Sequence, residues 1–102
     1  MALQIEQPIA IELRLLGADE RQLARRLAAL DDAPELDGEV LVALVGGRAV
    51  AALSLADRRV VADPFVPNTE PVALLQLRAA QLSVAGRRRA RRVLRPRLAY
   101  NS

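Results

Sequence analysis

Residues 40–55 read Val-Leu-Val-Ala-Leu-Val-Gly-Gly-Arg-Ala-Val-Ala-Ala-Leu-Ser-Leu. Two apolar runs that contain β-branched residues flank Gly46 and Gly47, which can adopt the positive φ angles of a tight turn. The stretch therefore predicts a β-hairpin. Because both runs are apolar at nearly every position, we expect the two strands to lie in the centre of a sheet or to be covered on both faces.

The residues before the hairpin predict a strand and a helix. Residues 9–15 alternate between apolar and polar side chains, the pattern of a half-buried strand. Asp19 followed by Gln22 has the chemistry of a capping box, in which the two side chains satisfy amides of the first helical turn. Leucines then recur at helical spacing, so a helix is predicted over about 19–31.

The residues after the hairpin predict a short strand and a second helix. Val60, Val61 and Ala62 form a brief apolar run that Asp63-Pro64 stops. Thr69 can cap a helix, and Gly86 is a natural place for that helix to end. The expected fold is therefore α+β, an antiparallel sheet of about four strands with two helices, in the order β-α-β-β-β-α. It occupies residues 1–86.

Composition argues against most catalytic chemistry. The chain has 102 residues with no Cys and no His, so it lacks the thiolate ligand, the commonest metal ligand and the commonest general base. Ser54 and Ser83 have no His or Lys to activate them. The acidic residues between 31 and 39 lack the spacing of a calcium loop, which predicts a solvated turn. We expect no catalytic, cofactor or metal site.

The first residues lack a signal peptide's pattern, and no apolar run approaches the ~18 residues of a membrane span. The sequence therefore predicts a cytoplasmic protein without a transmembrane segment.

Charge divides the chain into two parts. Residues 1–86 hold eight Arg and twelve acidic residues, a net charge of −4, whereas residues 87–102 hold seven Arg and no acid, a net charge of +7. We expect this arginine-rich tail to contact an acidic partner. The predicted contact residues are Arg87, Arg88, Arg89, Arg91, Arg92, Arg95 and Arg97.

Three uses of the tail stay open. Ala90, Val93, Leu94 and Leu98 would share one helical face until Pro96 interrupts it. Such a segment could contact nucleic-acid phosphates, lie on an anionic membrane surface, or be a disordered end or dock on an acidic protein surface.

The order of elements resembles the N-terminal half of the GNAT acyltransferase superfamily, over about residues 9–85. Residues 9–30 look like its first strand and helix, 39–55 like its central hairpin, and 60–65 like its fourth strand and exit. The resemblance implies a pyrophosphate loop for acyl-CoA with the pattern Gln or Arg, two residues, Gly, one residue, Gly or Ala. Residues 67–72 depart from it, because they contain no Gly and place an acid and Pro71 at the helix start. We expect a degenerate half-domain without acyl-CoA binding.

The resemblance also implies a fifth strand beside the fourth, which this sequence does not contain. The edge made by Val60, Val61 and Ala62 would then be unpaired, and a second copy could bury it, so we expect a homodimer. The leading hypothesis is a non-catalytic binding protein that contacts nucleic acid or an acidic protein through its tail. The alternatives are a divergent acyltransferase completed by dimerisation and a small subunit of a larger complex.

Overall fold

The structure is a computed structural model that describes the backbone of residues 10–101 and the side chains of residues 10–86. In chain order the elements are β1 (Ile11–Leu15), a 3₁₀ turn (Ala18–Glu20), α1 (Arg21–Leu30), β2 (Val40–Val45), β3 (Arg48–Ser54), β4 (Val60–Ala62) and α2 (Thr69–Asn101). Within the predicted first strand, Ile9 lies outside the described residues.

The four strands form one antiparallel sheet in the order β1-β2-β3-β4. The predicted hairpin is confirmed: β2 pairs with β3, and Gly46 and Gly47 make the turn with φ angles of 59° and 81°. The α+β class and the order β-α-β-β-β-α are also confirmed. The two-residue turn joins neighbouring strands directly, which is why this part of the topology follows from local sequence.

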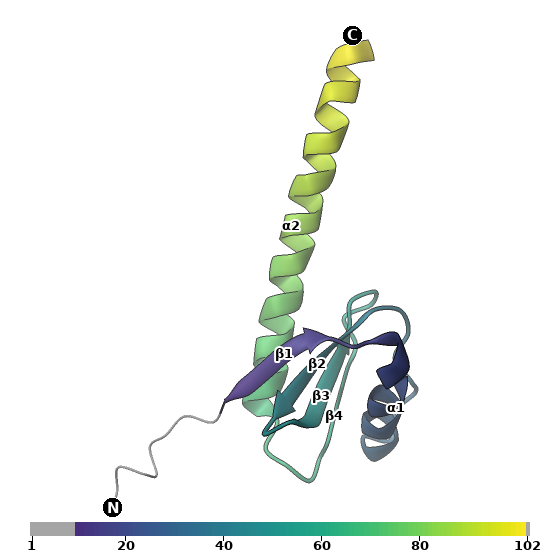
Figure 1. Cartoon of the computed structure of the whole chain (residues 1–102), viewed down its shortest axis with the longest axis vertical. Coiled ribbons are helices and arrows are strands. Elements are labelled where there is room, and N and C mark those ends of the chain that lie inside the picture. Colours follow the sequence, from purple (N-terminus) through teal and green to yellow (C-terminus); the bar gives the residue numbers. More distant parts are fainter. Residues whose placement is uncertain (1–9, 102) are drawn as a thin grey trace, which may run out of the picture.

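The helices cover opposite faces of the sheet, with α1 on one side and α2 on the other (Figure 1). Leu27 and Ala28 of α1 pack with Val42 of β2, whereas Leu75 of α2 packs with Leu53 of β3. This arrangement explains why the hairpin strands are apolar on both faces, since each face of β2 and β3 meets a different helix.

A β-bulge in β3 changes the direction of one side chain. Ala43 pairs with Ala51 and Leu44 pairs with Ala49, so Val50 is the additional residue on β3. Val50 and Ala51 consequently both pack in the core on the α2 side. The bulge places Val50 near the start of α2, where it contributes to the pocket described below.

The predicted cap of α1 is wrong. The helix begins at Arg21 after the 3₁₀ turn, and the residue that reaches back is Glu20, whose carboxylate accepts the N–H of Gly17 at 2.9 Å. Arg14 on β1 explains this choice, because its guanidinium donates to both oxygens of Glu20, at 2.6 and 2.8 Å. A contact between β1 and this turn therefore outweighs the local capping pattern.

The predicted end of α2 at Gly86 is also wrong, and Pro96 does not end the helix either. One helix continues to Asn101 (Figure 1). Gly86 is not among the glycines with positive φ, so it does not adopt the conformation that terminates helices. A helical Gly costs only about 1 kcal/mol relative to Ala, and the strong helix formers that follow it can offset that cost. Pro96 has no N–H, so the helix loses one hydrogen bond, the one to the carbonyl of Arg92, and continues past it.

Candidate interaction site

The basic residues lie on a part of α2 that extends past the sheet. Leu75 and Ala79 are buried against the sheet, and among the side chains that the structure describes Leu82 is the last one of α2 to pack on this core. Residues 84–86 are all exposed, and a Cβ placed on Gly86 would meet no atom of another element within 4 Å. At 1.5 Å per residue, the remaining helix projects for roughly 20 Å (Figure 1).

All seven arginines predicted to contact a partner fall on this projecting segment, which we call the basic extension (residues 87–101). Their backbone is helical, and their side chains lie outside the described residues.

The predicted dimer edge on β4 is partly covered by the chain itself. Val61 pairs with Ala52 of β3, and the outward N–H of Ala62 donates to a carboxylate oxygen of Asp31 at 3.2 Å. Arg59, just before β4, donates to the carbonyl of Pro34 at 2.9 Å. The loop after α1 therefore runs beside the edge, and the proposed strand pairing there stays a prediction.

This covering loop is the acidic segment of residues 31–39. Leu36 anchors it in the core at 2% exposure, and Arg21 donates to the carbonyl of Gly38 at 3.0 Å. Arg25 also pairs with Glu35 at 3.0 Å. Its five carboxylate residues are all exposed. Among the described residues, no group of three or more Asp or Glu is arranged to hold a metal ion.

The loop between β4 and α2 is held by Asp63, whose side chain is only 2% exposed. One carboxylate oxygen accepts the N–H of Phe65 at 2.9 Å, and the other lies 3.8 Å from the guanidinium of Arg48. The side-chain amide of Asn68 donates to the carbonyl of Asp63 at 3.0 Å. The loop is therefore fixed from within, yet it leaves Phe65 80% exposed.

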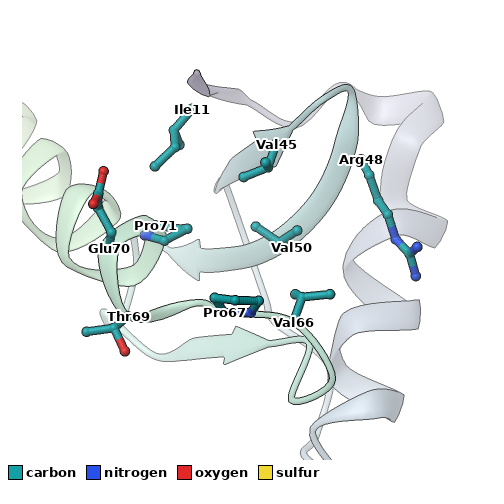
Figure 2. A pocket seen from close by; sticks show the side chains of 9 residues that line it. All are labelled: Ile11, Val45, Arg48, Val50, Val66, Pro67, Thr69, Glu70 and Pro71. Atoms are coloured by element: carbon teal, nitrogen blue, oxygen red, sulfur yellow. The ribbon is translucent and has the colours of Figure 1, made fainter. Parts of the chain in front are cut away.

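A pocket of about 660 Å³ opens beside this loop, between the sheet and the first turn of α2. Figure 2 shows the apolar side chains that line it, with Glu70 at one side and Arg48 at the other. Its lining consists of Ile11, Val45, Arg48, Val50, Val66, Pro67, Thr69, Glu70 and Pro71. The size is within the range of ligand pockets, and most of the lining is apolar.

The start of α2 does not suit a phosphate. Pro67 and Pro71 have no N–H, and the N–H of Val72 is already donated to the carbonyl of Asn68 at 2.9 Å. Glu70 is exposed and brings a negative charge to the helix N-terminus, where a bound anion would otherwise be favoured.

The buried hydroxyl of Ser54 is used for structure. It donates to the carbonyl of Asp37 at 2.8 Å and accepts the N–H of Ala56 at 3.3 Å. It therefore ties β3 to the acidic loop.

Sequence reasoning missed the pocket and Phe65. Phe65 is the only Phe of the chain and lies in a segment with three prolines. This aromatic residue in a proline-rich loop was the one sequence feature that could have indicated an exposed ring. The pocket itself combines residues from four separate segments.

No helix within residues 10–101 is long and apolar enough to cross a membrane. No family model, curated protein or solved structure matches this chain. The similarity to the GNAT superfamily therefore stays a hypothesis based on the order of elements.

Proposed function

We propose that this chain is a non-catalytic, homodimeric interaction protein of the cytoplasm whose basic extension binds a polyanionic partner, with nucleic acid as the first candidate. The supporting observation is the path of α2, which leaves the sheet before its arginine-rich part begins. Seven Arg without an acidic neighbour are thereby carried on an element that projects from an acidic body.

A projecting helix of this charge suits phosphates. Each Arg that neutralises a phosphate releases condensed counterions, which gives affinity without sequence information. Base stacking contributes little, because Phe65 and Tyr100 are the only aromatic residues. We therefore expect binding that depends strongly on salt and weakly on sequence.

The test measures binding of the full chain to duplex DNA and to single-stranded RNA over about 50–200 mM salt. The variant Arg87→Gln/Arg88→Gln/Arg89→Gln keeps good helix formers and removes three cations. If the three side chains contact duplex phosphates, the slope of log affinity against log salt becomes shallower by about 2–3.

The matched control is Arg78→Gln, an exposed arginine on the part of α2 that packs on the sheet. We expect it to leave the slope unchanged. An unchanged slope in the triple variant would remove the basic extension from nucleic-acid binding. Capture of an acidic protein from nuclease-treated lysate, lost in the triple variant, would assign the extension to a protein surface instead.

A further inference from the structure

Phe65 is an exposed aromatic side chain on a loop that is already ordered. It is 80% exposed, although its backbone N–H is bound by the buried carboxylate of Asp63. Asn68 adds bonds to the carbonyls of Asp63 and Val66, at 3.0 and 3.4 Å. Because the loop needs little further ordering, burying this ring in an interface would carry a small entropic cost.

An apolar pocket lies beside the loop that carries this ring. Val66 and Pro67, the next two residues in the chain, form part of its wall, and Val50 is brought there by the bulge in β3. One loop therefore carries an exposed aromatic side chain and part of the wall of an apolar pocket. A surface that carries both halves of a contact can bind a second copy of itself about a two-fold axis.

The charges at this pocket are also self-complementary. Arg48 and Glu70 lie on opposite sides of the apolar lining (Figure 2). A two-fold axis in the plane of the surface, passing between them, brings Glu70 of each copy opposite Arg48 of the other. Two ion pairs would then flank an apolar centre, which is the usual anatomy of a specific interface.

We propose that this pocket is the homodimer contact, with Phe65 of each copy inserted into the pocket of its partner and with reciprocal Arg48–Glu70 pairs. A Phe ring buries about 150–250 Å². Two such rings and the pocket walls that they cover account for much of the roughly 1,000 Å² that a specific interface needs. The inference rests on the homodimer of the proposed function and is independent of the basic extension.

The pocket suits dimerisation better than the β4 edge. That edge has three residues, and Asp31 already occupies the outward N–H of Ala62. Strand addition draws its affinity from such outward groups, so their occupation weakens the pairing that the sequence suggested.

The first test measures the mass of the full chain by sedimentation or light scattering over micromolar concentrations, without nucleic acid. Phe65→Ala should raise the dimer dissociation constant at least ~30-fold, as expected for an aromatic hot spot. The matched control is Leu77→Ala, which removes another exposed apolar side chain at 56% exposure and should leave the constant unchanged.

The second test uses charge exchange. Arg48→Glu and Glu70→Arg should each weaken the homodimer, because like charges then face each other. An equal mixture of the two variants should recover dimerisation, since both facing pairs are then opposite in sign. Circular dichroism of each variant checks folding. Arg48→Glu could unfold the chain because Arg48 contacts Asp63, and in that case a double variant replaces the mixture. Glu70→Arg combined with Arg48→Gln should recover part of the dimerisation that Glu70→Arg alone loses, because an arginine at position 70 then no longer faces Arg48.

A wild-type chain that is monomeric throughout would overturn the proposal. So would a dimer that persists unchanged in Phe65→Ala, which would place the contact elsewhere, for example at Val60. Failure of the mixed variants to associate would overturn the reciprocal charge pairing. A monomeric wild type would also remove the homodimer from the proposed function, whereas a dimer that persists in Phe65→Ala would overturn only the contact proposed here. Binding of nucleic acid by the basic extension is tested separately, by its salt dependence.

Discussion

Glu20 lies in the turn before α1 and contacts two residues that precede this turn. Its carboxylate accepts from the Arg14 guanidinium and from the N–H of Gly17. These two contacts lower the pKa of Glu20 to about 2, with the Arg14 hydrogen bond as the larger cause. The same hydrogen bond raises the pKa of Arg14. One carboxylate thus joins β1 to the turn that starts α1.

This pair predicts a pH dependence of stability. The pKa of Glu20 falls from about 4.5 in the unfolded chain to about 2 in the folded one. The carboxylate therefore stabilises the fold above the higher value, and this contribution is lost as the pH falls through that interval. The free energy of unfolding of the wild type should exceed that of Glu20→Gln near neutral pH, and the gap should close toward pH 2.

Urea unfolding at several pH values measures this gap. Glu39→Gln, which changes an exposed carboxylate of the acidic loop, serves as the control. A gap between wild type and Glu20→Gln that stayed constant with pH would contradict the assigned contacts.

Glu70 and Pro71 at the start of α2 lead to a prediction about acetyl-CoA. A ligand that binds only the folded state raises its melting temperature. Because the first turn of α2 offers an acid and few free amides, acetyl-CoA should leave the melting temperature unchanged. A clear, concentration-dependent rise would support the alternative of a divergent acyltransferase.

At the scale of single elements, α2 has two different parts, since its first half packs on the core and its second half is the basic extension. Leu75 is fully buried against the sheet. Leu75→Ala should lower the free energy of unfolding by about 2–5 kcal/mol, because it leaves a cavity between helix and sheet. Leu77→Ala, on the exposed side of the same helix, should stay within about 0.5 kcal/mol of the wild type. Denaturant unfolding of both variants checks this orientation of α2.

Substitutions of Gly86 test whether α2 is one continuous helix through this position. Gly86→Ala should keep or raise helicity, since Ala is favoured over Gly by about 1 kcal/mol within a helix. Gly86→Pro should lower it, because proline costs about 3 kcal/mol there. Far-UV circular dichroism compares the two full-length variants. Identical spectra would show that the helix does not pass through residue 86.

The elements that sequence predicted correctly are those whose evidence is local. The hairpin follows from two apolar runs around Gly46-Gly47, and β4 from three apolar residues before Asp63-Pro64. The predicted start of α1 was wrong because Arg14, seven residues before the first residue of the helix, decides which side chain caps the turn. The predicted end of α2 was wrong because a glycine allows a helix to end but does not force it to end.

The candidate site was predictable only in its charge. The run of arginines is visible in the sequence, but the pocket depends on the bulge at Val50 and on the loop that brings Pro67 beside the sheet. Neither the bulge in β3 nor the position of Pro67 beside the sheet produces a repeating pattern in the sequence. The shielding of Ala62 by Asp31 joins residues 31 positions apart and was equally hidden.

At the scale of the whole molecule, the part of the core that lies within residues 10–86 is built from aliphatic side chains. Both faces of β2 and β3 are covered by aliphatic side chains, one face by α1 and the other by α2. Of the arginines in the body, several donate to backbone carbonyls, such as Arg26 to Ala49 at 2.8 Å and Arg21 to Gly38 at 3.0 Å. These cations hold loops and strand ends in place.

The projecting helix also gives the molecule a large electric dipole moment. Its net negative body and its positive extension are separated along the axis of α2. In the field of a polyanion such a molecule experiences a torque that turns the extension forward before contact, which raises the fraction of productive encounters at low ionic strength. The direction of approach would therefore be set while the two molecules are still apart.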